Sequence, residues 1–245
     1  MTRISSLSGA LFVLLAQATA SASELYDAVL ASNVDSVQVL LAAGADVVEQ
    51  GELGTPLHVA AVQGNRRIAD ILVAKGADIE ASREGSSTRP LHQAASFGNL
   101  DVVALLIEKG AKVDVRNDLG STPLHEAVQG RHSGVVKVLL DHGADINATN
   151  TNRHAALNLA LRSRQHDLAI LFIERGADPN LPGPNGNRPL HYAAAMGLSD
   201  VIELLVERGA DIRARNLMGK SPLAAALDEK EVQAAETLRR LGATE

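Results

Sequence analysis

The chain has 245 residues, of which 46% are hydrophobic, 21% charged and only 2% aromatic, and its formal net charge is −6. The acidic balance and the lack of a basic run argue against nucleic acid as the main partner, because phosphate binding relies on clustered Lys and Arg. The sequence contains no cysteine, which excludes a disulfide framework, a cysteine nucleophile and a lipid-modified cysteine anchor.

The first 22 residues follow the pattern of a secretory signal peptide. Arg3 gives a short basic start, an apolar run covers Leu7–Ala16, and small residues alternate over Ala18–Ala22. We expect cleavage after Ala20 or Ala22 and an exported mature protein, periplasmic in a bacterium or secreted. The apolar run is well short of the roughly 20 residues that cross a bilayer. No membrane span is therefore expected after cleavage, and an uncleaved anchor is the less favoured alternative.

From residue 23 onward, one phrase recurs at an almost fixed interval. The residue before each Pro-Leu-His, or before its remnant, starts a unit, and the unit starts are Thr55, Arg89, Thr122, Ala155, Arg188 and Ser221, in steps of 34, 33, 33, 33 and 33 residues. A second marker, Gly-Ala-Asp or a variant, begins 21 residues after each start, at Gly76, Gly110, Gly143, Gly176, Gly209 and Gly242. Counting back 21 residues from Gly44 gives a degenerate opening copy at Ser23. We therefore expect seven units in one array over residues 23–245.

Each unit reads as two short helices followed by a turn. Thr or Ser is a good cap for the first helix, and Pro at its first position gives up an N–H that would be unpaired anyway. Gly64, Gly98 and Gly197 lie nine residues after their unit starts, where a left-handed residue between two helices is expected. The second helix carries apolar residues at i, i+3 and i+4, as in Ile68, Ile71 and Leu72, which is the period of one buried helical face.

These two markers, with the phrase Thr122-Pro123-Leu124-His125 and the 33-residue period, resemble the ankyrin-repeat family from about Ser23 to the last residues. The resemblance implies an all-α solenoid, in which helix pairs stack with a right-handed sense and each pair is followed by a finger-like turn. It also implies a module that binds other proteins. One pair cannot bury its apolar stripe alone, so the stack is obligatory. We also expect the protein to be a monomer.

The fifth unit departs most from the pattern. Ala155-Ala156-Leu157-Asn158 lacks the capping Thr, the Pro and the His together, and Arg153 and Arg164 replace turn glycines. We therefore expect this unit to be the weakest joint of the array.

No catalytic or metal-binding pattern is present. The histidines His58, His92, His125 and His191 are separated by the repeat length, and the resemblance implies that they hydrogen-bond the turns between repeats. His125 and Glu126 begin like a zinc-protease motif, but Gln129 stands where the second ligand must be. Gly219-Lys220-Ser221 resembles the end of a phosphate-binding loop, but Ala214 replaces its first glycine and Pro222 removes an amide. No enzyme activity, cofactor or metal is expected.

The positions that change from unit to unit are the best candidates for partner binding. They are the exposed ends of the first helices and the tips of the turns, which the family geometry would place on one concave face. The candidates are Gln63, Phe97, Gln129, Arg162, Tyr192 and Met196 on the helices, with Asp118, Leu119, Asn185, Leu217 and Met218 at the tips. For Phe97 and Tyr192, partly buried packing is the alternative to a role as aromatic anchors.

We interpret the chain as an exported, non-enzymatic scaffold that binds a protein through this concave face. Two alternatives stay open. In the first alternative, the chain is an enzyme, or the accessory or regulatory subunit of a periplasmic enzyme. In the second, it is an effector exported to act on host proteins.

Overall fold

A computed structural model describes residues 22–244 of the chain. The chain divides into two compact units, Met1–Lys112 and Val113–Glu245. Apart from Ala22, the predicted signal peptide lies outside the described residues.

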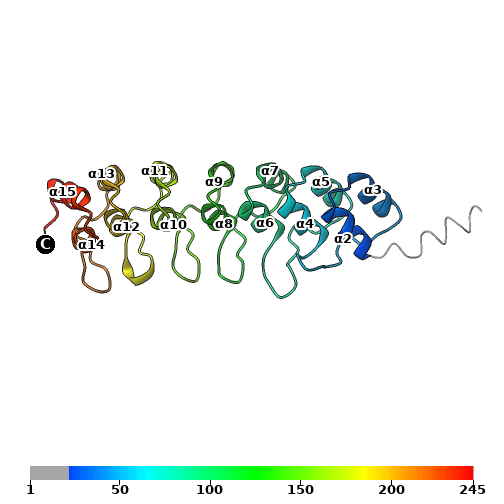
Figure 1. Cartoon of the computed structure of the whole chain (residues 1–245), viewed down its shortest axis with the longest axis horizontal. Coiled ribbons are helices and arrows are strands. Elements are labelled where there is room, and N and C mark those ends of the chain that lie inside the picture. The colour runs from blue at the N-terminus through cyan, green and yellow to red at the C-terminus, as the bar shows by residue number, and fades with distance from the viewer. Residues whose placement is uncertain (1–21, 245) are drawn as a thin grey trace, which may run out of the picture. The chain divides into compact units, whose positions relative to one another are not determined.

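The described part of the first unit is a set of helix pairs joined by turns. The pairs are α2 (Ala22–Leu30) with α3 (Val34–Ala42), α4 (Pro56–Gln63) with α5 (Arg66–Ala74), and α6 (Pro90–Ser96) with α7 (Leu100–Glu108). The even-numbered helices form one layer and the odd-numbered helices the other, and the turns extend past the even-numbered layer (Figure 1).

The second unit repeats this arrangement. Its pairs are α8 (Pro123–Gln129) with α9 (Ser133–Asp141), α10 (Ala156–Arg162) with α11 (His166–Glu174), α12 (Pro189–Ala195) with α13 (Ser199–Glu207), and α14 (Pro222–Asp228) with α15 (Val232–Arg240). A short 3-10 helix, η1 (Pro184–Gly186), lies in the turn before α12.

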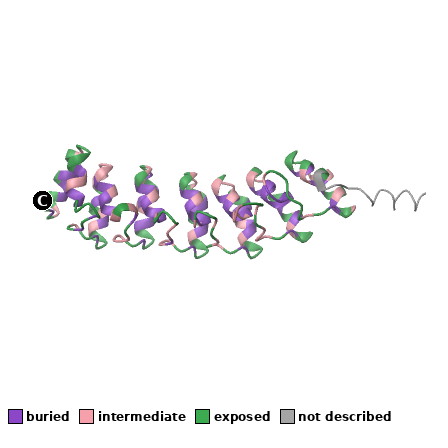
Figure 2. Cartoon of the chain, turned by 90° about the horizontal axis from the view of Figure 1, so that it is seen from below, coloured by how far each residue is buried: buried purple, intermediate pink, exposed green. Residues whose placement is uncertain are grey.

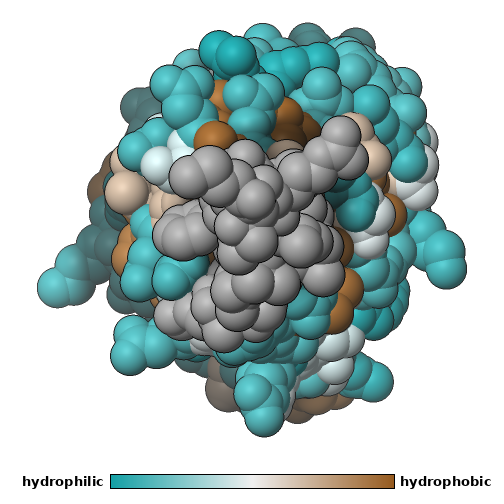
Figure 3. Space-filling view, turned by 90° about the vertical axis from the view of Figure 1, so that its right-hand side faces the viewer, coloured by the Kyte–Doolittle hydropathy of each residue, from teal (hydrophilic) through white to brown (hydrophobic). Residues whose placement is uncertain are grey.

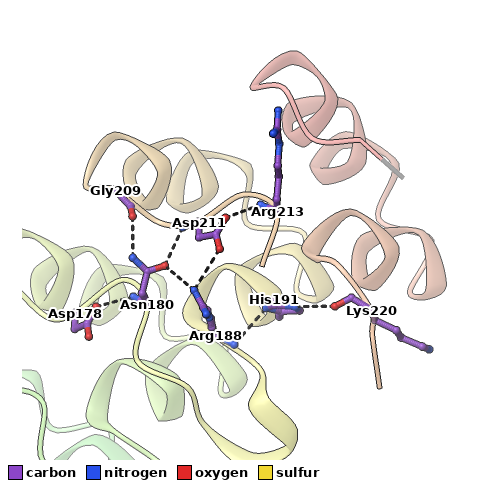
Figure 4. Close-up of polar contacts among 8 residues, drawn as sticks. All are labelled: Asp178, Asn180, Arg188, His191, Gly209, Asp211, Arg213 and Lys220. Atoms are coloured by element: carbon purple, nitrogen blue, oxygen red, sulfur yellow. Dashed lines mark hydrogen bonds and ion pairs between the residues drawn. The ribbon is translucent and has the colours of Figure 1, made fainter. Parts of the chain in front are cut away.

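A buried histidine joins each of several first helices to the turn that follows the pair. The imidazole Nδ1 of His191 accepts from the backbone N–H of Arg188 at 3.2 Å, and Nε2 lies 3.0 Å from the carbonyl oxygen of Lys220 (Figure 4). Since Nδ1 accepts, the ring proton is on Nε2 and is donated to the carbonyl, so the ring is neutral. His58 and His125 make the same pair of bonds, to Thr88 and His154 respectively.

The capping hydroxyls divide into two groups. Oγ1 of Thr55 and of Thr122 lies 2.8 Å from Nδ1 of the histidine in the same helix. In the last repeat, which contains α14 and α15, Ala224 replaces that histidine. There Oγ of Ser221 accepts from the Ala224 backbone N–H at 3.2 Å. The predicted hydroxyl cap is thus present at Ser221, and the threonine hydroxyls are also engaged by the imidazole.

The core lies between the two helix layers and is aliphatic, as the composition predicts. Figure 2 shows the buried residues on the sides of the helices that face one another. The predicted stripe is confirmed at Ile68 and Leu72 in α5, which are buried, but Ala69 is buried and Ile71 is only half-buried. The reason is that α5 also packs against α3 and α7 in the same layer, which brings the i+1 position into the core.

The N-terminal end has the polar surface that a terminal repeat needs. Glu24, Asp27, Asp35 and Gln38 are exposed on α2 and α3, although Val39 is exposed beside them. Hydrophilic residues dominate the visible surface in Figure 3, which looks onto this end.

The fifth repeat, which contains α10 and α11, lacks the histidine bridge. Asn158 stands at the histidine position and is 1% exposed, and neither its Oδ1 nor its Nδ2 has a hydrogen-bond partner. The carbonyl that corresponds by spacing is that of Asn187. It accepts from the backbone N–H of Gly183 at 2.8 Å, and the shorter side chain of Asn158 makes no hydrogen bond to it. Arg153 and Arg164 adopt the predicted left-handed conformation, with φ of 61° and 52°. These features support the expectation of a weak joint, which stays a prediction.

Burial lowers the pKa of His58, His125 and His191 below the ordinary value of 6.5, against the opposing effect of the carbonyl that each ring contacts. Because the folded pKa is below the unfolded one, the unfolded chain binds more protons below pH 6.5. The stability that the neutral rings contribute is complete above about pH 6.5 and is lost as the pH falls toward the folded pKa.

We therefore predict that the free energy of unfolding falls between pH 7 and pH 5, by about 1.4 kcal/mol for each unit by which a histidine pKa is lowered. Denaturant unfolding across this range measures the change. His125→Asn, which copies the residue found at position 158, should lower stability at pH 7 and make the pH dependence shallower. The control His142→Asn alters an exposed ring and should do neither. An equal pH dependence in His125→Asn and the parent would refute this explanation.

A second prediction concerns the left-handed arginine between α10 and α11. Arg164→Gly should raise the free energy of unfolding by up to about 1 kcal/mol, because a non-glycine residue in this conformation costs about 1–2 kcal/mol. The greater freedom of glycine in the unfolded chain offsets about 0.5–1 kcal/mol of the gain, and the exposed ion pair of Arg164 with Glu231, at 3.6 Å, about 0–1 kcal/mol.

Lys230 has the same conformation, with φ of 62°, and within the described chain it makes no ion pair. Lys230→Gly should therefore gain at least as much as Arg164→Gly. Midpoints of urea unfolding compare the two variants with the parent. A lower midpoint for Lys230→Gly would show that the left-handed backbone carries no penalty here.

Candidate partner-binding surface

In the first unit, the structure places both predicted helix-end residues on the surface. Phe97 follows α6 and is 55% exposed, so partial burial does not account for this aromatic residue. Gln63 ends α4, but its side chain is tied to the preceding pair: Nε2 donates to the carbonyl of Leu30, and Oε1 accepts from Oγ of Ser32 at 3.1 Å. Phe97 is thus open to a partner, and Gln63 already has a structural contact.

In the second unit, the predicted helix-end residues lie on α8, α10 and α12. Gln129 and Arg162 are exposed, whereas Tyr192 and Met196 are half-buried. The Tyr192 hydroxyl lies against the turn before α12 and hydrogen-bonds the side chain of Asn187 in that turn. Partial burial therefore describes Tyr192, although the exposed part of its ring belongs to the same surface.

Arg162 contacts the imidazole of His154 and acts electrostatically on Tyr192. Its Nη1 is 2.6 Å from Nε2 of His154, which belongs to the turn before α10. Burial, with the charge of Arg162 as the second cause, lowers the pKa of His154. The same guanidinium opposes the rise in the pKa of the Tyr192 hydroxyl that burial produces. The structure thus places Arg162 against His154, and the charge of Arg162 acts on the Tyr192 hydroxyl of the next helix in the layer.

The predicted turn-tip residues of the second unit are exposed and are paired through the backbone. The carbonyl of Leu119 accepts from the N–H and the hydroxyl of Thr151 in the next turn, each at 2.9 Å. The carbonyl of Asn185 accepts from the N–H of Leu217 at 2.9 Å. The exposed tip residues are Asp118, Leu119, Asn185, Leu217 and Met218. The side chains of Leu217 and Met218 are 79% and 64% exposed, so the tips offer apolar surface.

Sequence reasoning missed one row of this surface. Gln93, Glu126 and Leu159 lie four residues after the starts of their repeats and are half-buried, and Glu126 and Leu159 share the layer of Tyr192 in the second unit. Asn117 Nδ2 donates to Glu126 Oε1 at 3.0 Å, and burial raises the pKa of this carboxyl despite that bond. The signal was available, because these residues precede the predicted helix-end positions by one helical turn and vary as widely in chemistry.

Among the described residues, no group of three or more His, Cys, Asp or Glu side chains is placed to hold a metal ion. The part of the chain with described positions also contains no helix that is long and apolar enough to cross a membrane.

Comparison with known families agrees with this architecture. The family described as ankyrin repeats, in three copies, matches residues 82–150 and 157–244, and a single ankyrin repeat matches residues 54–83. The chain belongs to the ankyrin-repeat family. The interruption between the two longer matches falls at residues 151–156, where the fifth unit loses its Thr and Pro. The predicted family and all-α fold are confirmed.

The chain is also similar to curated proteins and to a solved structure. Protein phosphatase 1 regulatory subunit 27 of Homo sapiens and that of Mus musculus are each 41% identical to this ankyrin-repeat chain over 61 residues. That stretch is 24% of this chain and 40% of each relative, so the chain spans well under half of the length of these proteins.

The second relative is a solved structure, the ankyrin-repeat domain of Bcl-3, described as a unique member of the IkappaB protein family. It matches with a TM-score of 0.79 and 27% identity, over 88% of this chain and 97% of that one. Ankyrin repeats are generally scaffolds for protein–protein interaction and typically lack enzyme activity, and this chain shares their architecture over most of its length.

Proposed function

We propose that this chain is a non-enzymatic scaffold that binds a protein partner through its even-numbered helices and turn tips. One observation carries the proposal: residues that keep the repeat are buried, and the neighbouring residues that vary are exposed. In α10, Leu157, the leucine of the repeated phrase, is 2% exposed, whereas Arg162 in the same helix is exposed. In the sixth unit, Ala194 is buried, and Met196 stands half-exposed after the helix end. A preformed surface of this kind loses little conformational entropy on binding.

The partner's identity is a separate proposal. The alternative role of an accessory or regulatory subunit is the same act of binding, with an enzyme as the partner. The similarity to phosphatase regulatory subunits favours this version, although the matched stretch covers only 24% of the chain. Turnover by the purified chain without a co-purifying enzyme would contradict the non-enzymatic proposal.

We further propose that the protein is exported, on the evidence of the N-terminal pattern of Arg3, Leu7–Ala16 and Ala18–Ala22. The expected result is a mature chain that begins after Ala20 or Ala22. Intact-mass measurement of protein from the exported fraction tests this, and a species that retains residues 1–16 would refute it. No residue distinguishes an effector that acts on host proteins from the scaffold proposed above.

The binding surface is tested by single substitutions of Phe97, Arg162, Tyr192 and Met196 to Ala. Aromatic, Met and Arg side chains are enriched at the centre of interfaces, so we predict that at least one variant weakens partner capture by about 1–2 kcal/mol. The helical signal and the unfolding midpoint should change little for the exposed residues. The measurement is affinity capture from the native envelope, followed by mass spectrometry and by titration with the captured protein.

Two controls bracket this experiment. Leu139 is 0% exposed on α9, so Leu139→Ala should lower stability by about 2–5 kcal/mol and affect capture only through unfolding. Lys137 is exposed on the same helix, and Lys137→Ala should change neither quantity. If all four test variants capture the partner as well as the parent does, the even-numbered layer is the wrong surface and the turn tips or odd-numbered helices become the candidates.

A further inference from the structure

Three arginines lie at or beside the joint where α10 ends and α11 begins, in the second unit. Arg131 comes from the corresponding joint between α8 and α9, and its Nη2 donates to the carbonyl of Ser163 at 2.9 Å. Its guanidinium therefore lies beside the residue that separates Arg162 from Arg164 in the sequence. Arg131 and Arg164 also line one hollow of about 350 Å³, together with His166. All three arginine side chains are exposed.

The charge of this cluster, Arg131, Arg162 and Arg164, is poorly neutralised. Arg164 is 3.6 Å from Glu231, but Arg131 and Arg162 make no ion pair within the described chain. Their contacts are a backbone carbonyl and the neutral ring of His154. The arginine cluster is therefore a local concentration of positive charge on a chain whose net charge is −6.

The carboxylates near the hollow are already engaged. His166 contacts Asp167 through Nδ1 at 3.3 Å and Asp200 through Nε2 at 2.5 Å. These contacts hold the pKa of His166 above its ordinary value, so the imidazole competes with the arginines for the two carboxylates. The guanidinium groups of Arg131 and Arg162 stay available to an acid from outside the chain.

Two members of the cluster occupy costly backbone positions. Arg131 and Arg164 have φ of 62° and 52°, whereas Gly64, Gly98 and Gly197 occupy the corresponding positions of other repeats. Non-glycine residues in the left-handed region persist where the surroundings or the function require them. Ser32 and Lys230 occupy the same position in two further repeats, so the case for a use of the arginine side chains rests on their charge and contacts.

We propose that Arg131, Arg162 and Arg164 receive an acidic segment of the partner protein, in which Asp or Glu side chains pair with the guanidinium groups. The inference rests on the proposed scaffold function and specifies the chemistry of its partner. Planar guanidinium groups pair with carboxylates through two parallel hydrogen bonds, which gives both energy and orientation. A nucleic acid is disfavoured because its backbone would extend from three arginines onto a predominantly acidic protein surface.

The test uses the full chain and three labelled probes in fluorescence anisotropy: a peptide of alternating Asp and Glu, the same peptide with Asn and Gln, and a single-stranded RNA of equal length. At low ionic strength, the acidic peptide should bind about tenfold or more tightly than the neutral peptide or the RNA, and added salt should weaken it. No binding of the acidic peptide, or equal binding of the RNA, would overturn the proposal.

Variants assign the binding to the cluster. Arg131→Gly combined with Arg162→Gln should weaken acidic-peptide binding about tenfold or more, with the circular-dichroism spectrum unchanged. Arg131→Gly is chosen because glycine suits the left-handed backbone. The matched control, Lys137→Gln with Arg213→Gln, also removes two exposed positive charges from the second unit. It should leave the affinity within about twofold, because screened charges at a distance contribute little.

Equal weakening by the control pair would show that overall charge is responsible, and it would overturn the assignment to this cluster. The proposed function is judged separately, by partner capture with the Phe97, Tyr192 and Met196 variants. If capture depends on those residues but the acidic peptide does not bind, the scaffold function stands and the acidic-segment inference fails. If those variants capture the partner as well as the parent does while the cluster binds the peptide, the helix-end surface of the proposed function fails and the acidic-segment inference stands.

Discussion

The buried imidazole that links a helix start to the following turn is the interaction on which each repeat depends. In His125, one nitrogen accepts from the N–H that precedes the helix, and the other donates to a carbonyl 29 residues on. The bond of His58 spans 30 residues, because the turn after its pair is one residue longer. The turn length therefore varies while the anchored carbonyl is kept. Both nitrogens are used only in the neutral ring, which ties the order of the turns to the protonation state of the core.

The fifth unit shows what the chain tolerates when this link is absent. Asn158 is buried without a partner, and an unpaired buried amide costs about 1–3 kcal/mol. The neighbouring pairs still contact α10 and α11, so nearest-neighbour packing holds the unit in place. The same unit carries Arg162 and Arg164, and its neighbour carries Arg131. The repeat that gives up most of its structural residues thus also carries two of the three arginines of the cluster.

Much of the fold was predictable from the sequence because the repeat reports each structural position several times. The helix pairs and the left-handed Arg164 followed from spacing, and the role of the histidines followed from the family resemblance. In α5, Ile68 and Leu72 are buried as predicted, but Ala69 is buried in place of Ile71, since periodicity within one helix does not reveal the packing of neighbouring helices in its layer. The candidate surface was only partly predictable. Phe97 is exposed as expected, but the repeat pattern did not predict that Gln63 donates to the Leu30 carbonyl one repeat earlier, or that Arg162 contacts His154. The roles of these residues in binding stay predictions.

The pairing of the turn tips in the second unit has a consequence for how such a surface changes over generations. Adjacent tips are joined by main-chain atoms, as between Asn185 and Leu217, and a main-chain bond persists when most side chains are exchanged. Leu217 and Met218 can therefore be replaced by residues of other shape and charge while the framework stays folded. The molecule separates the atoms that maintain its structure from the atoms that a partner meets, so one inherited frame can acquire a new specificity by single, individually tolerable steps.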